Sequence, residues 1–284
     1  MESYSTVIQS NTKGLNLSPK ELWRYRDLVF LFVKRSFITR YKQTILGPAW
    51  AIIQPLLTTV VFTFIFGNIA GLGAQGVPSF VFYFSGNMMW GYFSSCLTGT
   101  ANTFISNRGI LGKVYFPRMV MPVSGVMTNM ITLAIQFVFF SFFLIFYMIT
   151  GENIHPNLFA LMLPVLVLQS AMLGLGVGVI ISALTTKYRD LAMLTGFGVS
   201  IWMYATPIAY DMEAMGAFAT GGKYHALYML NPVTSIINIF RYGFLGIGQI
   251  EWLYYAISWV VTFIVLLIGI VMFNRVEKTF MDTI

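Results

Sequence analysis

Residues 40–55 read RYKQTILGPAWAIIQP, and the charge pattern changes sharply within this stretch. Residues 20–42 are basic and contain Lys20, Arg24, Arg26, Lys34, Arg35, Arg40 and Lys42. From Gln43 to Asn107 the chain then has no Asp, Glu, Lys or Arg. About 20 apolar residues of α-helix cross the hydrocarbon core of a bilayer, so the uncharged run can hold two spans and a turn. The stretch therefore predicts a membrane boundary.

The composition excludes a soluble globular domain. Of the 284 residues, 57% are hydrophobic and 10% are charged, and the mean hydropathy is +0.74. Soluble domains contain roughly 25% charged residues. In lipid the backbone must satisfy its own hydrogen bonds, so a spanning chain forms helices or a closed barrel. The apolar stretches are long and lack the alternation of barrel strands, which predicts an all-α integral membrane protein.

The uncharged windows predict six transmembrane helices in a membrane domain of residues 46–274. They lie near residues 49–69, 79–100, 119–150, 157–184, 191–210 and 252–274. Within the fourth span, GLGVG at residues 174–178 predicts close packing against a neighbouring helix. Residues 211–251 differ, because their best apolar window is interrupted at Asn231-Pro232 and is too short to cross a bilayer. We expect two short helices there, re-entrant or at the outer face, which meet near Asn231.

The Lys and Arg residues assign the two sides of the membrane. Six spans place both ends of the chain on one side, and every Lys and Arg except Lys223 and Arg241 then falls on that side. Because positive loops face the cytoplasm, the tails at residues 1–18 and 275–284 are expected to be cytosolic. Residues 1–18 are polar, and no cleaved signal peptide is expected. The distribution of the net charge of +7 favours this topology over nucleic-acid binding.

Residues 19–45 are predicted to form an amphipathic helix at the membrane interface. Ser18 fits an N-cap, with Pro19 at the first helical position and Glu21 three residues after the cap. On a helical wheel the charged side chains share one arc, and the opposite arc holds Leu22, Tyr25, Val29, Phe30, Phe32, Val33 and Phe37. Such a helix lies with its apolar face in lipid. The pattern fits a plain membrane anchor and equally one whose charged face docks a cytosolic partner.

The sequence lacks the patterns of catalytic, metal-binding and nucleotide-binding sites. The nearest approach to a phosphate loop, GILGKV at residues 109–114, has the wrong glycine spacing and no hydroxyl after the lysine. His155 and His225 form no His-x-x-x-His pair, which argues against catalytic zinc, and the single Cys96 excludes an internal disulfide. The expected spans contain no charged residue, which disfavours a proton- or ion-coupled carrier. We expect no catalytic residue, metal or cofactor in this chain.

Polar and aromatic residues recur on one face of two expected spans. The first has Gln54, Thr58, Phe62 and Phe66, and the fifth has Thr195, Trp202, Thr206 and Tyr210, with Tyr204 nearby. The second span contains Tyr83, Asn87, Trp90 and Tyr92. An aromatic ring can stack on the C–H face of a sugar while a hydroxyl or indole N–H binds its rim. Many weak contacts of this kind suit a sliding polymer. The alternative is structural, because Trp and Tyr gather at membrane interfaces and Phe commonly faces lipid.

The stretch at residues 40–55 resembles the first-span motif of type-2 ABC exporter permeases, most closely the branch that exports lipid-linked O-antigen, capsular polysaccharide and teichoic acid. Further segments resemble this family in order along the chain, namely LGKVYFPR at 111–118, KYRDL at 187–191, PIAY at 207–210, NP at 231–232 and RVEKTF at 275–280. The resemblance implies a six-span half-transporter of the bacterial inner membrane that moves a lipid-linked polysaccharide out of the cytosol.

The resemblance also implies partners and residue roles. The chain would pair with itself, contact membrane lipids and bind two copies of a separate ATPase subunit, which would hold the ATP and magnesium. Residues 19–41 and 107–117 would receive the motion of the ATPase, with coupling residues Arg24, Lys34, Arg35, Arg108, Lys113, Tyr115 and Arg118. The first and fifth spans would line the channel, and residues 211–251 would form gate helices. The channel-lining residues would be Gln54, Thr58, Phe62, Phe66, Tyr83, Trp90, Trp202, Tyr204, Thr206 and Tyr210.

Two other functions stay open from the sequence. A type-2 permease for a small lipid or drug would share every family feature, and the aromatic stripes disfavour it only weakly. An integral membrane enzyme acting on lipid-linked sugars would place carboxylates or histidines near one interface. Asp211, Glu213, His225 and Glu251 do gather on the expected outer side. Association with an ATPase distinguishes the exporter from the enzyme.

Overall fold

The computed structural model describes residues 19–73, 76–111, 116–188 and 190–279 of the chain. Every regular element among these residues is a helix. The helices are α1 (Pro19–Arg24), α2 (Arg26–Tyr41), α3 (Trp50–Phe62), α4 (Ser79–Ala101), α5 (Thr103–Ser106), α6 (Arg108–Leu111), α7 (Val120–Ile149), α8 (Leu163–Lys187), α9 (Leu191–Tyr204), α10 (His225–Met229), α11 (Pro232–Leu245) and α12 (Trp252–Thr279). Shorter turns extend them, with 3₁₀ turns at Gly47–Ala49, Leu158–Met162 and Glu213–Met215 and a π-helix at Thr63–Ile69.

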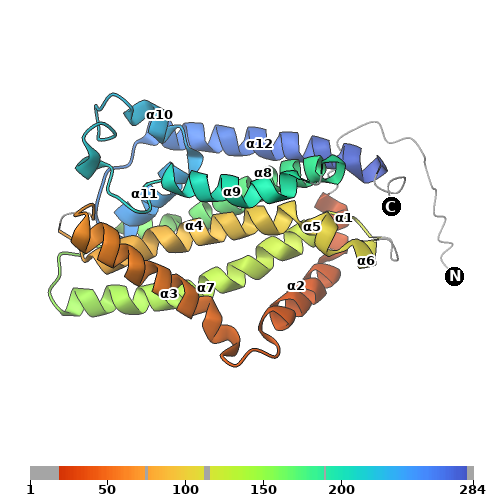
Figure 1. Ribbon diagram of the computed structural model, residues 1–284, viewed down its shortest axis with the longest axis horizontal. Helices are drawn as coiled ribbons and strands as arrows, with labels where there is room; N and C mark the ends of the chain where they lie inside the picture. Colours follow the sequence, from red (N-terminus) through yellow and green to blue (C-terminus); the bar gives the residue numbers. More distant parts are fainter. Residues whose placement is uncertain (1–18, 74–75, 112–115, 189, 280–284) are drawn as a thin grey trace.

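Four long helices, α4, α7, α8 and α12, run side by side and make the body of the molecule (Figure 1). α4 lies between α7 and α8, and most of its side chains are buried. α8 approaches α4 at two glycines. A Cβ atom on Gly178 would lie 2.6 Å from the carbonyl oxygen of Leu97, and one on Gly174 would lie 2.8 Å from Cβ of Cys96. The predicted close packing at residues 174–178 is therefore confirmed.

Four helices among the described residues are long and apolar enough to cross a membrane, at Gly47–Ile69, Val120–Ile149, Leu158–Thr185 and Trp252–Asn274. The sequence predicts two more spans, near residues 79–100 and 191–210. α4 has the required length, but its Ser, Gly, Asn and Thr residues lower its hydropathy. Because other helices surround α4, it needs small packing residues more than an apolar surface.

The expected fifth span is shorter than the sequence predicts. α9 ends at Tyr204 after 14 residues, and turns and bends follow at residues 205–210. A helix of this length measures about 21 Å, against a hydrocarbon core of about 30 Å. α9 alone therefore does not reach across a bilayer.

The basic segment at the start of the chain forms two helices where one is predicted. The helix is interrupted at Tyr25, so α1 and α2 are separate. α2 ends at Tyr41, four residues before the predicted boundary at residue 45, and the chain turns into α3. α2 and α3 together form a V beside the bundle (Figure 1).

The apolar face of α2 packs on protein. Val29, Phe32 and Val33 are buried in a cluster with residues of α7, α8 and α12, and the rings of Phe32 and Phe116 lie 5.7 Å apart. The prediction that this face lies in lipid is wrong for these three residues, because the first turn of α7 covers it. Phe30 points away from the bundle and is exposed.

Two short helices meet at Asn231, at the end of the molecule opposite α1 and α6 (Figure 1). The Asn231 side chain caps α11 by accepting a hydrogen bond from the Val233 N–H at 3.2 Å, and Pro232 occupies the first helical position. This arrangement explains why the chain breaks there. α11 is largely buried against α4, α8 and α12. A gate function for α10 and α11 stays a prediction.

Candidate functional site

A polar groove opens between the V of α2 and α3 and the body of the bundle. Its volume is about 780 Å³, and its walls come from the end of α2 and from α3, α4 and α7. Its polar side chains include Gln54 and Thr58 of α3, Asn87, Trp90 and Thr98 of α4, and Thr128, Asn129, Thr132 and Gln136 of α7. A polar surface of this size inside an apolar bundle marks a candidate binding site.

The local sequence keeps the polar groove open. Between α2 and α3 the backbone takes positive φ angles of 64° at Gln43 and 51° at Gly47, in the region that glycine tolerates best. This turn sends α3 away from the axis of α2. Deeper in the groove, a Cβ atom on Gly91 or Gly125 would meet no atom within 4 Å. Two helices thus present bare backbone to the groove, which widens it.

Hydrogen bonds fix the rim of the polar groove. Arg40, in the last turn of α2, donates from Nη2 to Oδ1 of Asn129 at 3.1 Å and from Nη1 to Oγ1 of Thr132 at 3.4 Å. Gln136 donates to the carbonyl oxygen of Ala51 in α3 at 3.0 Å. α7 therefore ties both arms of the V to the bundle.

The floor of the polar groove contains an unsatisfied acceptor. Asn87 donates from Nδ2 to Oγ1 of Thr59 at 3.3 Å. Its Oδ1 is buried and has no hydrogen-bond partner among the described residues. An unpaired buried carbonyl oxygen is costly, so it favours a ligand that brings a donor such as a hydroxyl group.

Three of the predicted channel-lining residues, Gln54, Thr58 and Trp90, line the polar groove. Phe62 and Phe66 lie further along the same helix and contact each other, with ring centroids 5.2 Å apart. Tyr83 is fully buried beside Phe62 and Phe82 and does not reach the groove.

The four predicted channel-lining residues of the fifth span have different environments. Trp202 packs edge-on against Trp90 and Phe93 and donates its indole N–H to Oδ1 of Asn231 at 3.1 Å. Thr206 is fully buried, and its Oγ1 accepts a hydrogen bond from Asn231 at 3.0 Å. Tyr204 points outward and is 64% exposed. Tyr210 donates to the Tyr204 carbonyl oxygen, and its hydroxyl contacts that of Tyr228. None of these four lines the groove.

The predicted coupling residues that the structure describes lie at the end of the molecule that holds α1, α2 and α6. Arg24, Lys34 and Arg35 are exposed. Arg118 is only 8% exposed in this single chain. Arg108 begins α6, whereas Lys113 and Tyr115 fall outside the described residues. Their contact with an ATPase stays a prediction.

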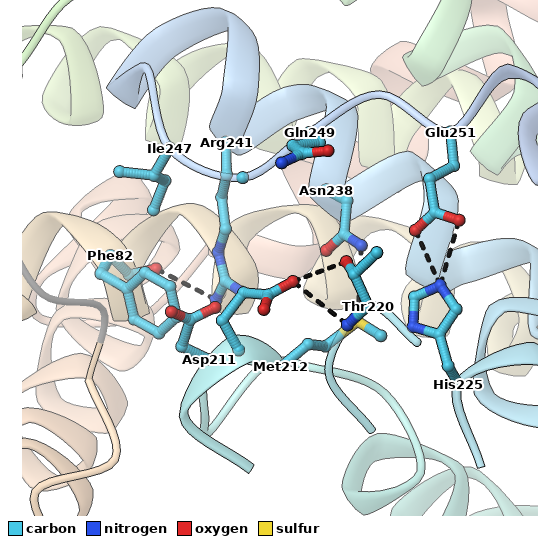
Figure 2. A pocket seen from close by; sticks show the side chains of 12 residues that line it. Phe82, Asp211, Met212, Thr220, His225, Asn238, Arg241, Ile247, Gln249 and Glu251 are labelled. Atoms are coloured by element: carbon cyan, nitrogen blue, oxygen red, sulfur yellow. Dashed lines mark hydrogen bonds and ion pairs between the residues drawn. The ribbon is translucent and has the colours of Figure 1, made fainter. Parts of the chain in front are cut away.

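At the opposite end a buried cation holds three segments together (Figure 2). Arg241 of α11 donates to the carbonyl oxygens of Pro207, Ile208 and Phe82 and to Oγ of Ser85. Its guanidinium carbon also lies 3.7 Å from the centre of the Phe82 ring. Burial lowers the pKa of Arg241 to about 9 although Asp211 favours the charge, so the side chain stays cationic at neutral pH. Arg241 is a structural clamp.

A histidine and a carboxylate pair beside this clamp (Figure 2). His225 Nε2 lies 2.9 Å from Oε1 and 3.0 Å from Oε2 of Glu251, and Nδ1 lies 2.9 Å from the Phe218 carbonyl oxygen. Burial works against the protonated imidazole, but the bonds to Glu251 and Phe218 and the charge of Glu213 outweigh it, so the pKa of His225 is raised. Glu213 accepts hydrogen bonds from the N–H and hydroxyl of Thr220. Among the described residues, no group of three or more His, Cys, Asp or Glu side chains could hold a metal.

The polar wall of α7 is not among the predicted site residues. Thr128, Thr132 and Gln136 recur at four-residue spacing in an otherwise apolar helix, with Asn129 beside them. The same periodicity pointed to Gln54 and Thr58 in the first span. The predicted stripes combined polar residues with aromatic ones, whereas α7 has no Trp or Tyr on this face.

Comparison with known proteins places the chain in a family. Residues 27–245 match the model of the ABC-2 type transporter family. Two proteins of Klebsiella pneumoniae named O-antigen export system permease protein RfbA are 27% and 28% identical to it over 258 residues, or 90% of this chain and 94% of each relative. A protein of the same name from Myxococcus xanthus is 28% identical over 223 residues, 78% of this chain and 82% of the relative. The resemblance of the sequence motifs is thus confirmed, and the chain belongs to the ABC-2 type transporter family as a multi-pass membrane permease.

Proposed function

We propose that this chain is the channel-forming subunit of an ATP-driven exporter that moves a lipid-linked polysaccharide from the cytosol across the plasma membrane. Its family supplies permeases that work with an ABC ATPase. The names of three relatives, which match most of the chain, support polysaccharide as the cargo. No phosphate loop occurs in the sequence, so ATP would be hydrolysed on the partner subunit.

The polar groove is the observation that carries this proposal. Its walls offer amides, hydroxyls and a buried indole, and they contain no carboxylate, because the chain has no Asp or Glu between Asp27 and Glu152. Neutral donors and acceptors beside aromatic rings match the hydroxyls and C–H faces of sugars. Individually weak contacts of this kind let a polymer move on.

Two copies of the chain would complete the channel. α9 has no buried residue in the single chain, and its exposed side chains include Met193, Phe197 and Ile201. α3 is likewise exposed at Leu57, Val60 and Val61. A second copy facing α3 and α9 would cover both helices, and two ATPase subunits would serve the pair.

Each copy would cross the membrane six times. The four long apolar helices would make four of these crossings. The other two would be made by α4, which the bundle shields, and by α9 together with residues 205–210. Basic residues are concentrated in α1, α2 and the segments around α6 and α7. By the positive-inside rule that end, and both termini, would lie in the cytosol.

The geometry argues against His225 as a general base at the opposite end. Both of its ring nitrogens are already bound. A general base needs a free nitrogen or oxygen within reach of a substrate proton. His225 and Glu251 therefore serve to hold the chain together.

The test combines assembly, ATP hydrolysis and export. The chain is co-expressed with the ABC ATPase encoded beside it, the complex is purified, and polymer at the cell surface is quantified. Gly125→Phe would fill the polar groove and reduce export at least tenfold while assembly and ATP hydrolysis persist. Val138→Phe is the matched control, because Val138 is an exposed residue of the same helix that does not line the groove. Failure to assemble with the ATPase, or full export by Gly125→Phe, would overturn the proposal.

A further inference from the structure

We propose that Arg40, Asn129 and Thr132 form a binding site for a phosphate group carried on an apolar chain. This inference rests on the proposed function, in which the cargo is attached to a lipid. The site lies at the rim of the polar groove, where α2 ends against α7. It would hold the head of the lipid while the attached sugars extend into the groove.

The side chains at this rim have more hydrogen-bond donors than their own acceptors use. A guanidinium has five N–H donors, and the structure uses one bond from Nη2 to Asn129 and one from Nη1 to Thr132. Arg40 is exposed, so its remaining donors can reach a ligand. The Thr132 hydroxyl adds another O–H. Arginine in this setting suits a phosphate, which accepts two parallel N–H bonds.

The charge of Arg40 has no carboxylate partner in the described part of the chain. The ion pairs found there join Arg26 to Asp27 and His225 to Glu251. No Asp or Glu occurs in α3, α4 or α7. Arg40 is exposed and these walls supply no anion, so an anion that pairs with it would come from outside the chain.

The surroundings of the rim favour an anion that is attached to a lipid. Ile45 and Leu46 in the turn after α2 are exposed apolar side chains, and Leu57 continues this surface along α3. Tyr41 and Trp50 line the same rim of the groove. Aromatic residues with a polar edge are typical of the boundary between headgroups and hydrocarbon. An apolar tail could lie along the exposed turn while its phosphate meets Arg40.

The groove behind the rim has room for more than a phosphate. Its volume of about 780 Å³ lies in the range of small-molecule sites. Gly91 and Gly125 leave open space there, and the unpaired Oδ1 of Asn87 lies at the floor. A hydroxyl donor on the first sugars would satisfy that oxygen.

The same contacts could instead serve only to tether α2 to α7. Asn129→Asp separates the two roles. It keeps an acceptor for Arg40 and so retains the tether, but its carboxylate would neutralise the cation and repel a phosphate. Loss of binding in this variant with an unchanged melting temperature indicates a phosphate site.

The experiment measures binding of dodecyl phosphate to the purified full-length chain in a non-ionic detergent, by native mass spectrometry. Dodecanol tests the tail without the phosphate, and inorganic phosphate tests the anion without the tail. We expect dodecyl phosphate to bind at one site per chain and the other two probes to bind at least tenfold more weakly. Arg40→Gln and Asn129→Asp should each weaken dodecyl phosphate at least tenfold, whereas Arg40→Lys should retain part of the affinity. Arg26→Gln is the control, because Arg26 is exposed on the same helix and does not line the groove.

Three results would overturn the inference. They are equal binding by Arg40→Gln and the parent chain, equal binding of dodecanol, and equal binding of inorganic phosphate, which would indicate a soluble anion. The measurement requires no ATPase and no export. A chain that binds dodecyl phosphate through Arg40 but assembles with no ATPase would contradict the proposed function and leave the phosphate site standing. A chain that assembles with the ATPase and exports polymer but does not bind dodecyl phosphate would contradict the phosphate site and leave the proposed function standing.

Discussion

At the scale of single residues, neighbouring aromatic side chains on α9 have different environments. Trp202 lies against Trp90 and Phe93 and is bonded to Asn231. Tyr204, two residues later, is 64% exposed. Because successive helix positions are rotated by about 100°, two residues apart point to nearly opposite sides. The sequence treats the pair as one aromatic stripe, but the structure makes one a packing residue and the other a surface residue.

Replacing these residues one at a time should separate the two environments. Trp202→Ala removes two ring contacts and a hydrogen bond, and should destabilise the fold by about 3 kcal/mol. Tyr204→Ala should change stability by no more than about 0.5 kcal/mol and reduce export if its ring contacts the polymer. Thermal unfolding of the detergent-purified chain and surface polymer are the measurements. Equal loss of stability in both variants would contradict this assignment.

The pair of His225 and Glu251 predicts how stability depends on pH. Burial lowers the pKa of His225, but the bonds to Glu251 and Phe218 and the nearby Glu213 raise it above its ordinary value of 6.5. A raised folded-state pKa contributes stability that is complete below pH 6.5 and is lost as the pH rises through the raised value.

The melting temperature should therefore fall by a few degrees as the pH rises from about 6 to about 8. Glu251→Gln removes the charge that favours the imidazolium and should flatten this decline. Lys223→Gln serves as the control, because it removes a charge from the same end of the molecule and leaves the pair intact. An unchanged decline in Glu251→Gln would show that other groups cause it.

At the scale of elements, close contact between α4 and α8 organises the bundle. Gly174 and Gly178 face α4, and Gly176 faces Leu266 of α12 at 2.9 Å from a Cβ position. Small residues on both faces of α8 let three helices pack without a gap. α9 lacks such contacts, since a Cβ on Gly196 or Gly198 would meet nothing within 4 Å.

A methyl group on each helix tests this difference. Gly178→Ala would place its Cβ 2.6 Å from a backbone oxygen and should destabilise the fold by about 1–3 kcal/mol. Gly196→Ala meets no atom and should be neutral or stabilise by up to about 1 kcal/mol, because alanine favours helix. Melting temperatures and yield of folded protein are the readouts. Equal effects of the two changes would mean that α8 can shift away from α4 at little cost.

At the scale of the whole molecule, the single chain leaves one face of α3 and one face of α9 exposed. α3 and α9 carry exposed apolar residues along their length, whereas α4 is enclosed. In the proposed pair, a two-fold axis would bring α3 of one copy to α9 of the other and repeat the contact. The proposed pairing predicts that these two helices meet between copies.

Cross-linking between differently tagged copies tests the pairing. One copy carries Val61→Cys and the other Ile201→Cys, and the native Cys96 is buried and stays unreactive. Oxidation should join the two copies in most of the protein. A copy carrying Phe142→Cys, on the exposed face of α7, should form no disulfide cross-link to the same partner. Equal cross-linking of Phe142→Cys would contradict an interface on α3 and α9.

The sequence by itself determined the helical membrane fold, the charge boundary before the first span, the break at Asn231 and the family. These properties depend on local composition, because the energetic cost of exposing a charge or an unpaired backbone group to lipid is paid residue by residue. The sequence predicts six spans, whereas four helices among the described residues are long and apolar enough to cross a membrane.

Only the tertiary structure decided which polar residues meet. Arg40 and Asn129 lie 89 residues apart in the chain and are bonded across two helices. Hydropathy reports whether a helix tolerates lipid, but it cannot report which side faces a neighbour, because that depends on the packing of the other helices. The same limit explains why Tyr83 and Thr206, read as channel residues, are buried, and why the polar wall of α7 emerged only in the fold.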